Sequence, residues 1–444
     1  MSEPGSEGAP PPGRHWQTSR AWAGALSAAW GLCVLGPPAA LVAAAAAAGA
    51  GAAPAALVAG RAVGLAVLAA LAAQTVLAAR PRALDRPFGL DRVIRFHQRA
   101  AVGVAAAVVL HPLLALQGLA SAGAPVSDRP WGLGLGLAAA AVLLAGVAAA
   151  VFREEVRLGY QRWRRGHRAM WLGVGLALAH ALAMGAAPIA WGALAAVAAA
   201  ALLWRLVGRH CFNVRRLRVG DVRQETHDTW TIELDAPTDR PLAHDPGQFM
   251  FLRLHRRDRP SEEHPFTIAS SPVPGGPAAA TIKKSGDFTD TVDRTLRGDG
   301  ARVEGPFGRF SFVRDDPPAL LLIAGGVGIT PIMSMLRCLR DAGDDRPATL
   351  LCANRTEADI LFRRELEAMP ASVKVVHVLS KPGADWPGAR GHVDEAFIRA
   401  HAGDALADAH AYVCGPPAMM RAVTGALRRL GLPRRRVHAE RFTL

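Results

Sequence analysis

The chain has 444 residues, which suggests two or three domains. Hydrophobic residues make up 51% of it, too many for a wholly soluble or a disordered protein. Its net charge of +14 is unevenly placed: residues 1–208 hold seven acids, seventeen arginines and no lysine, so 30 acids and 34 basic residues remain for residues 209–444. Because the basic excess falls between apolar runs, it favours a membrane surface over a nucleic acid as the partner.

The first 208 residues are expected to form a membrane domain. Residues 1–20 are polar and rich in Pro and Gly, and we interpret them as a disordered leader. After them, six apolar runs approach the ~20 residues that span a bilayer. These runs predict a six-helix transmembrane bundle over residues 21–208. They lie at about 21–49, 57–79, 93–118, 132–152, 168–186 and 189–207.

Two arginine-rich loops predict the orientation of this bundle. The loops around residues 80–99 and 153–168 each carry six arginines, whereas the other connections are nearly uncharged. By the positive-inside rule both loops, the N-terminus and everything after residue 208 face the cytoplasm. The scattered cysteines agree with this compartment, because no C-x-x-C spacing indicates a disulfide framework, a zinc ribbon or an iron–sulfur domain.

Four histidines lie in or next to two of the predicted spans, His97 and His111 in the third and His167 and His180 in the fifth. Separations of 14 and 13 residues correspond to roughly 20 Å along a helix, so each helix offers one histidine near the cytoplasm and one deeper. This predicts that His97 faces His167 and that His111 faces His180. Facing imidazoles in a bundle can supply both axial ligands of a haem iron. The alternative for each is a hydrogen bond to a neighbouring helix.

Two features of the membrane half fit less simply. A step of 13 residues turns a helix by roughly 220°, so the fifth helix must be distorted, with Gly173 and Gly175 as candidates, or its histidines approach from different directions. Arg61, near the outer end of the second span, could neutralise a haem propionate, attract an anion or extend to the outer headgroups.

The second half predicts two soluble domains. Short strands separated by Pro, Gly and Asp turns indicate a small β-barrel over residues 211–316. After Pro317–Pro318, strands and helices alternate, which is typical of a parallel α/β sheet over residues 317–444. The predicted elements are strands at 214–222, 229–234, 248–254, 279–283, 302–304, 320–324, 349–353, 373–379 and 411–414, with helices at 331–339, 359–369 and 416–430.

The first turn of the α/β domain, residues 324–331, reads Ala-Gly-Gly-Val-Gly-Ile-Thr-Pro. Glycines let a phosphate approach the backbone, and the N-terminus of the following helix attracts the anion. Glycine turns also occur for packing alone, but this one has companions. His-Pro-Phe-Thr starts 61 residues before Gly325, Cys-Gly-Pro starts 89 residues after it, and Ser-Gly-Asp-Phe-Thr and Gly-Pro-Phe-Gly lie between the first two.

Together these motifs make residues 211–444 resemble the ferredoxin–NADP reductase superfamily, with His-Pro-Phe-Thr typical of its ferric reductase and NADPH oxidase branch. The two histidine pairs are similar to the haem-binding membrane domain of the same family. The resemblance therefore implies FAD, NADPH (or NADH) and two haems b as cofactors.

The resemblance also implies roles for individual residues. Phe266 would flank the flavin, Thr267 would lie near its reactive nitrogen, and the nicotinamide would meet Cys414. The haem irons would be held by His97, His111, His167 and His180. The FAD residues would be His264, Pro265, Phe266, Thr267, Gly286 and Thr289. The nucleotide residues would be Gly325, Gly326, Gly328, Thr330, Arg355, Cys414, Gly415 and Pro416.

Two of these assignments have simple alternatives. Arg355 follows the second strand of the α/β domain, where a guanidinium would meet the 2′-phosphate of NADPH, although a solvated loop arginine is the alternative. The family often ends in an aromatic residue stacked on the flavin. Phe442 would be that residue here, although Thr443 and Leu444 follow it. Otherwise Phe442 packs the last strand.

The expected activity is electron transfer from cytoplasmic NAD(P)H through FAD and two haems to an acceptor at the outer face of the cell membrane. Dioxygen is the favoured acceptor and a ferric chelate the alternative. A third hypothesis is a flavin reductase on an inert membrane anchor that donates electrons to a cytoplasmic partner protein. Neither the acceptor nor the oligomeric state follows from the sequence, and no nucleic-acid partner is expected.

Overall fold

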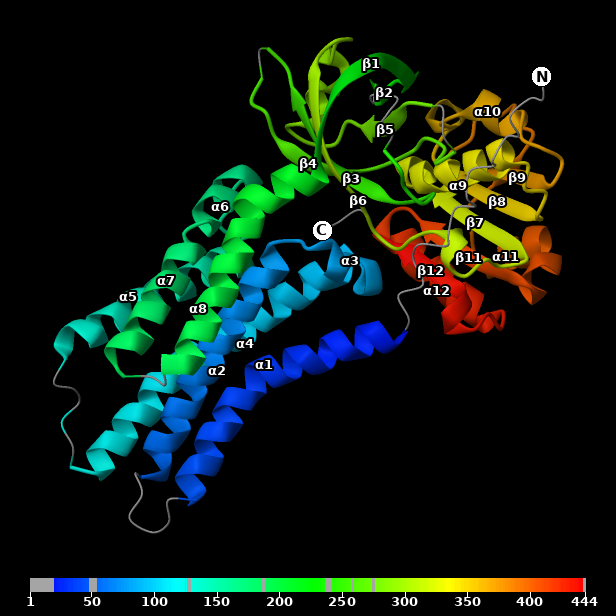
Figure 1. Ribbon diagram of the computed structural model, residues 1–444. Coiled ribbons are helices and arrows are strands. Elements are labelled where there is room, and N and C mark those ends of the chain that lie inside the picture. The colour runs from blue at the N-terminus through cyan, green and yellow to red at the C-terminus, as the bar shows by residue number, and fades with distance from the viewer. Residues whose placement is uncertain are drawn as a thin grey trace, which may run out of the picture. The chain divides into compact units, whose positions relative to one another are not determined.

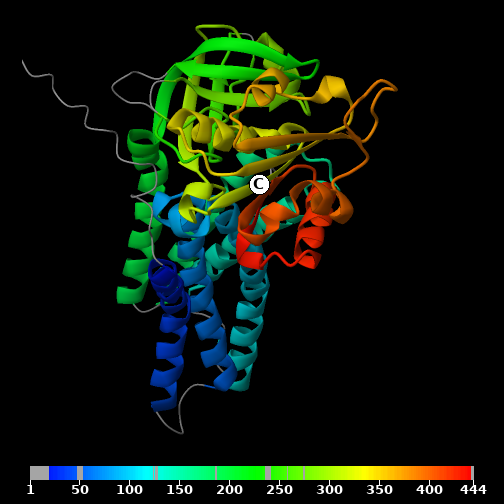
Figure 2. The same cartoon turned by 90° about the vertical axis from the view of Figure 1, so that its right-hand side faces the viewer.

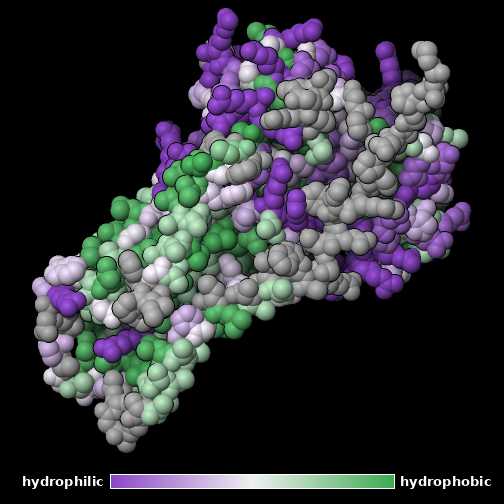
Figure 3. All heavy atoms as spheres, viewed as in Figure 1, coloured by the Kyte–Doolittle hydropathy of each residue, from purple (hydrophilic) through white to green (hydrophobic). Residues whose placement is uncertain are grey.

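The computed structural model describes residues 20–47, 54–123, 125, 129–185, 188–235, 242–257, 259–273 and 276–441. They divide into two compact units, a helical one within Thr18–His210 and one within Cys211–Leu444 that holds the described strands (Figure 1). Apolar side chains dominate the visible face of the helical unit, whereas polar side chains dominate the other unit (Figure 3).

In its described residues, the helical unit has six apolar helices and two short polar ones. Three of the described helices, α2, α4 and α5, are long and apolar enough to cross a membrane. The short helices α3 and α6 lie inside the two arginine-rich segments, where we expected only loops. The helices are α1 (Arg20–Ala47), α2 (Ala55–Ala78), α3 (Arg82–Phe88), α4 (Leu90–Ser121), α5 (Pro130–Val151), α6 (Tyr160–His167), α7 (Met170–Ala183) and α8 (Pro188–Leu203), followed by a π-helical segment, η1 (Trp204–Asn213).

Among the described helices, α2 packs closely against both α4 and α1, and α5 packs closely against α7 (Figure 1). Figure 2 gives a second view of this unit. Small residues permit this packing: a Cβ atom on Gly60 of α2 would lie 2.6 Å from the Ala115 nitrogen of α4. In apolar surroundings, where water does not drive helices together, close backbone contact of this kind is a main source of helix association.

The first domain of the strand-containing unit is one six-stranded antiparallel sheet with the strand order β4-β3-β6-β1-β2-β5. Its two edges meet next to the end of β4, where the Ala269 amide donates to the Ala279 carbonyl of β5 over 2.8 Å. Alternating inward residues build its core. The strands are β1 (Val214–Thr226), β2 (Thr229–Asp235), β3 (Phe249–His255), β4 (Glu263–Thr267), β5 (Ala278–Lys283) and β6 (Gly300–Phe307).

The second domain of the strand-containing unit is a parallel sheet with the order β10-β9-β8-β7-β11-β12. One buried cluster joins the sheet to α9 (Ile329–Ala342), and another joins it to α11 (Glu395–Ala402) and α12 (Pro417–Arg429). The strand order reverses between β7 and β11, the position where open α/β sheets bind ligands. The strands are β7 (Ala319–Gly325), β8 (Ala348–Asn354), β9 (Val373–Leu379), β10 (Ala389–Arg390), β11 (Ala409–Cys414) and β12 (Val437–Glu440).

The helix predicted over residues 359–369 is wrong in its first half. The Thr356 and Asp359 side chains form a capping box that closes a short 3-10 turn, Glu357–Asp359. Phe362 then takes a left-handed conformation with φ 55°, and helix α10 runs only from Arg363 to Glu367. The interpretation also missed β4, β10, α11 and β12.

Candidate cofactor sites

The helical unit brings the four histidines together in the two pairs that their spacing predicts. The His97 and His167 ring centroids lie 6.4 Å apart, and those of His111 and His180 lie 6.2 Å apart. All four side chains are half-buried. Metal–imidazole bonds are about 2 Å long, so two rings that shared one metal ion would have centroids roughly 6 Å apart. Both pairs have that spacing.

The pair farther from the arginine-rich segments in the sequence of each helix, His111 and His180, is held by two matching glycine motifs. The His111 Nδ1 atom lies 2.8 Å from the Gly60 carbonyl, and the His180 Nδ1 atom lies 2.8 Å from the Gly132 carbonyl. Since a carbonyl only accepts, each Nδ1 carries the proton, and each Nε2 is left as the free lone pair. One turn further along, a Cβ atom on Gly64 would lie 2.6 Å from the His111 ring.

Gly136 makes room for the His180 ring as Gly64 does for His111, since a Cβ atom on Gly136 would lie 2.8 Å from that ring. The two helix pairs therefore use one arrangement: a first glycine supplies the carbonyl, and a second, four residues later, makes room for the imidazole. Sequence reasoning missed this arrangement, although the spacing Gly-x-x-x-Gly in both segments is a visible signal.

The pair nearer the arginine loops, His97 and His167, is held differently. Both of its Nδ1 atoms are buried and have no hydrogen-bond partner in the part of the chain that the structure describes. Gln74 donates to the backbone carbonyl of His97, and Arg205 acts electrostatically on both histidines. The indole of Trp163 stacks on His167 at 5.0 Å.

A break between two helices resolves the 13-residue spacing of His167 and His180. Helix α6 ends at His167 and α7 begins at Met170, so the two histidines lie on separate helices. Gly173 and Gly175 do not create the distortion, because both lie inside α7, where Gly173 packs against Leu143.

Arg61, for which the sequence left three roles open, is exposed on α2.

These contacts fit a metal-centred group better than a set of unrelated histidines. The structure offers two facing imidazole pairs at ligating distance, free Nε2 atoms in one pair and partnerless buried nitrogens in the other. A histidine that only joins two helices would be expected to use its buried nitrogens in hydrogen bonds, as the Nδ1 atoms of His111 and His180 do but those of His97 and His167 do not. The residues present therefore suit bis-histidine ligation of haem.

In the antiparallel domain, the His264–Thr267 segment forms most of β4, an edge strand. The His264 ring stacks on Phe288 at 4.3 Å, and Phe266 lies 6.2 Å from the same ring. The Arg256 guanidinium lies over Phe288 as well, at 5.1 Å. Phe288 thus links this strand to the Ser-Gly-Asp-Phe-Thr segment, so that the two expected flavin motifs are adjacent.

The turn around Gly286 and Thr289 is shaped by the threonine hydroxyl. Thr289 Oγ1 accepts from the Ser285 amide over 2.8 Å and donates to the Gly286 carbonyl over 3.1 Å. Gly286 is exposed and a Cβ atom there would meet nothing within 4 Å, so its surface is open to a ligand. Pro265 lies in β4 and is half-buried, whereas Thr267 is buried.

Helix α9 attaches the parallel domain to the residues that follow Thr267. Its Ser334 hydroxyl donates to the Ser270 carbonyl over 2.8 Å, and the Arg337 guanidinium donates to the Ala269 carbonyl over 2.7 Å. Arg337 also forms a fork with the Glu365 carboxylate. Because α9 begins directly after the glycine turn, this clamp fixes the end of β4 relative to that turn.

The glycine turn packs directly on the Cys-Gly-Pro turn of the neighbouring strand. A Cβ atom on Gly325 would lie 2.9 Å from the Pro416 ring, and one on Gly328 would clash with the Cys414 carbonyl. Gly326, with φ 53°, has open space around it. Two of the three glycines therefore bring the turns together, and the third leaves backbone accessible.

Thr330 and Gly415 belong to the contact between the glycine turn and the Cys-Gly-Pro turn, Thr330 on the first and Gly415 on the second. The Thr330 side chain is buried, and its hydroxyl donates to the Val327 carbonyl over 3.0 Å. A Cβ atom on Gly415 would lie 3.1 Å from the Gly325 nitrogen. Both residues thus shape the turn at the point where the strand order reverses between β7 and β11.

Cys414 has a neighbour that sequence reasoning missed. Its register partner on β12 is Glu440, whose carboxylate also lies beside Gly308 of the Gly-Pro-Phe-Gly segment. Burial, and then the charge of Glu440, raises the pKa of the Cys414 thiol well above its usual value. The thiol is therefore protonated at neutral pH. Phe442, the expected flavin cap, lies outside the described residues.

Arg355 is exposed directly after β8, the strand next to the glycine turn. Lys381, also exposed, follows β9, and its amide donates to the Arg355 carbonyl over 2.8 Å. Two exposed cationic residues therefore follow neighbouring strands at the carboxyl end of the parallel sheet. Lys381 is a second candidate for a phosphate contact, and it could be found only once the register of β8 and β9 was known.

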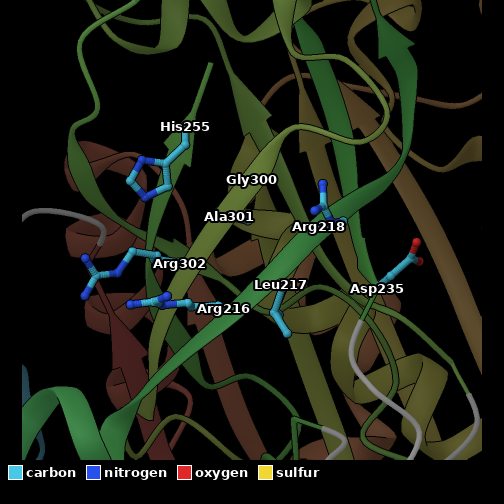
Figure 4. Close-up of a pocket in the computed structure, with 8 residues that line it drawn as sticks. All are labelled: Arg216, Leu217, Arg218, Asp235, His255, Gly300, Ala301 and Arg302. Atoms are coloured by element: carbon cyan, nitrogen blue, oxygen red, sulfur yellow. The ribbon is translucent and has the colours of Figure 1, made fainter. Parts of the chain in front are cut away.

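A basic hollow of about 790 Å³ lies elsewhere on the antiparallel sheet, outside the expected flavin motifs (Figure 4). Arg302 is paired across the sheet with both Arg216 and Arg253. Arg253 faces Glu263 at 3.7 Å, whereas no carboxylate among the described residues pairs with Arg216 or Arg302. Like charges directly opposite one another destabilise a sheet, so an anion in this hollow would stabilise it.

Comparison with known families assigns three parts of the chain. Residues 63–179 match the ferric reductase like transmembrane component, residues 213–310 an FAD-binding domain, and residues 322–425 an oxidoreductase NAD-binding domain.

Among curated proteins, the stachydrine N-demethylase reductase subunit Stc4 of Rhizobium meliloti is 31% identical over 227 residues, which are 49% of this chain and 64% of that protein. The glycine betaine monooxygenase reductase subunit of Chromohalobacter salexigens is 31% identical over 244 residues, 53% of this chain and 64% of that protein. This chain thus spans less than two thirds of either relative. A ferredoxin reductase in carbazole 1,9a-dioxygenase is 25% identical, with a TM-score of 0.47, over 52% of this chain and 69% of that one.

Together the domains define the class: this is a membrane protein that carries the FAD- and NAD-binding domains of an NAD(P)H-dependent oxidoreductase. More particularly, it is a ferric reductase-like transmembrane domain fused to a ferredoxin–NADP reductase-type module. The family resemblance expected from the sequence is confirmed.

Proposed function

We propose that this protein is a transmembrane flavocytochrome, in which bound FAD and two haems b supply electron transfer between cytoplasmic NAD(P)H and an acceptor at the outer face. The observation that carries the proposal is the pair of histidine sites, with ring centroids 6.4 and 6.2 Å apart. A reductase on an inert membrane anchor would have no use for two such sites.

The proposal includes six membrane spans, made by α1, α2, α4, α5, α7 and α8. Its support is the alternation of apolar helices with two arginine-rich segments. By the positive-inside rule, those segments, the N-terminus and the soluble domains would face the cytoplasm. His97 and His167 then hold the haem nearer the cytoplasm, and His111 and His180 hold the outer one.

Residues of the antiparallel and parallel domains bind the other two cofactors, FAD and NAD(P)H. His264, Phe266 and the turn around Gly286 and Thr289 hold FAD, whereas the glycine turn and the Cys414–Pro416 turn hold the nucleotide. Thr267 and Cys414 meet the reacting rings. Arg355 favours NADPH over NADH because a guanidinium matches the 2′-phosphate. Lys381 is a second candidate for contact with that phosphate.

Dioxygen is the proposed acceptor, with a ferric chelate as the alternative that shares the same path. One observation favours a different function: the two curated relatives are named as reductase subunits of an N-demethylase and a monooxygenase. By analogy, this protein would donate electrons to a separate cytoplasmic partner protein.

Anaerobic reduction of the purified full-length protein distinguishes these functions. After addition of NADPH, the visible spectrum should show bleaching of the flavin and a shift of the haem Soret and α bands. Oxygen and a ferric chelate are then added to separate samples, and reoxidation identifies the acceptor. Purified protein without a Soret band would overturn the proposal and favour the partner-protein function.

A His180→Leu variant tests the haem assignment in the same experiment, with His392→Leu as a matched control, since His392 is exposed on the parallel domain. The first should lose one haem per chain, and the control should keep both. Two haems in His180→Leu protein would contradict the assignment.

A further inference from the structure

Three metal-ligating side chains converge on the parallel domain, away from the cofactor residues. They are Asp315, His410 and His438, whose ligating atoms all lie within 4.8 Å of one another. The Nδ1 atom of His410 is 3.1 Å from Nε2 of His438, and that Nε2 is 3.6 Å from an Asp315 carboxylate oxygen.

Three different segments supply these side chains. His410 is the second residue of β11, His438 lies on the adjacent strand β12, and Asp315 belongs to the segment that leads from the antiparallel domain to β7. The two imidazoles stack at 5.3 Å, and the His438 ring also stacks on Tyr412 at 4.6 Å. Ring packing therefore holds both imidazoles in place before any ligand binds, which lowers the entropic cost of binding.

The spacing of the donors suits a small divalent cation. A tetrahedral ion with bonds of about 2.0–2.1 Å holds its ligand atoms roughly 3.3 Å apart. The observed 3.1 and 3.6 Å lie on either side of that value. Two imidazoles and one carboxylate are also a common donor set for zinc, with water in the fourth position.

The charges around these three side chains also agree with this chemistry. Arg435 and Arg436 face His410, and Arg309 faces His438. The Asp315 carboxylate supplies the one negative charge that a dication needs among these cations.

We propose that Asp315, His410 and His438 form a zinc site that ties the segment between the two soluble domains to the last strand of the parallel sheet. The site is separate from the redox cofactors. His410 lies four residues before Cys414, which is about 13 Å along a strand. The consequence of zinc binding is structural. Strand β12 also carries Glu440, so bound zinc would fix the strand that ends beside Cys414.

Equilibrium dialysis of the full-length protein in lipid nanodiscs against radioactive zinc tests the site, with iron measured separately to count haem. Asp315→Asn and His438→Gln should each weaken the binding of one zinc ion by about tenfold or more. At micromolar zinc, each variant should therefore hold one ion fewer than the wild type. His392→Asn removes an exposed histidine of the same domain and should keep wild-type binding.

Thermal unfolding gives an independent measurement. Zinc should raise the melting temperature of the wild type and of His392→Asn, because a ligand that binds only the folded state stabilises it, but not that of Asp315→Asn. Asp315 is exposed, so its substitution by Asn leaves the core intact and a folding failure is not expected. Equal zinc uptake by the wild type, Asp315→Asn and His438→Gln would overturn the proposal and leave a hydrogen-bonded histidine pair.

Discussion

Arg337 should be the residue whose loss most disturbs the relation between the flavin and nucleotide sites. Its guanidinium donates to the buried Ala269 carbonyl, forms a fork with Glu365 and lies over the Phe362 ring at 4.9 Å. Only 11% of the Arg337 side chain is exposed. An Arg337→Leu substitution removes all three interactions and leaves two acceptors behind.

The expected cost follows from these contacts. Leaving the Ala269 carbonyl unsatisfied costs about 1–3 kcal/mol. Breaking a fully buried ion pair costs roughly 3–5 kcal/mol, but Glu365 keeps Arg340 at 2.9 Å and is 27% exposed, so a smaller share applies. Together these give about 3 kcal/mol, which lowers the melting temperature of a unit of this size by roughly 6–12 °C.

Thermal unfolding followed by the release of flavin fluorescence measures this effect, with Arg340→Leu as the matched control. Arg340 also pairs with Glu365, but its side chain is 38% exposed, and its loss should cost about 0–1 kcal/mol. Equal destabilisation by the two substitutions would refute the clamp. If the proposed function is correct, Arg337→Leu should also slow the reduction of FAD by NADPH about tenfold or more, because the end of β4 is no longer held.

The pH dependence of this clamp has a defined sign. Burial on its own raises the pKa of Glu365, but the hydrogen bonds and charges of Arg337 and Arg340 outweigh it and hold that pKa below its usual value. Glu365 therefore contributes stability at pH values above the ordinary glutamate pKa, and this is lost as the pH falls through the depressed value. The wild type should lose more stability than Arg337→Leu over that acidic range.

Three further predictions concern other sites. His111→Leu should remove the outer haem and spare the inner one, as counted by pyridine haemochrome analysis; two haems per chain would contradict the pairing. Arg355→Ala should raise the KM for NADPH about tenfold or more while leaving that for NADH nearly unchanged, since a lost charge-assisted bond costs about 1.5–3 kcal/mol; equal effects on both would exclude a 2′-phosphate contact. Arg216→Gln should stabilise the antiparallel sheet by about 0.2–1 kcal/mol at low salt by removing one like-charge pair, and sulfate should reduce that gain; a loss of stability would show that Arg216 has a favourable role there.

Much of the architecture could be predicted because it depends on local patterns. Apolar runs gave helices α2, α4 and α5, and alternating strands and glycine turns gave the order of β7, α9 and β8. The histidine pairs followed from arithmetic, because a helix converts sequence spacing into depth. Local pattern failed where a side chain redirected the backbone, as the capping box of Thr356 and Asp359 does.

Long-range contacts were the part that no local pattern could supply. Glu440 comes beside Cys414 only through the parallel pairing of β11 and β12, whose sequences are short and carry no register signal. The clamp between Arg337 and the Ala269 carbonyl joins residues 68 positions apart, and a backbone acceptor has no side chain to mark it. His410 and His438 are 28 residues apart and meet for the same reason as Glu440 and Cys414.

The two histidine pairs show why the remaining chemistry depends on such contacts. From the sequence the pairs are equivalent, yet carbonyls hold the Nδ1 protons of His111 and His180, whereas the Nδ1 atoms of His97 and His167 are buried without partners in the described structure. A hydrogen bond from Nδ1 makes a ligating imidazole more basic. Arg205 adds positive charge beside His97 and His167. Both differences act in one direction, because a less basic ligand and a nearby cation each favour the reduced iron. If haems occupy both sites as proposed, the iron between His97 and His167 would therefore hold an electron more tightly than the iron between His111 and His180.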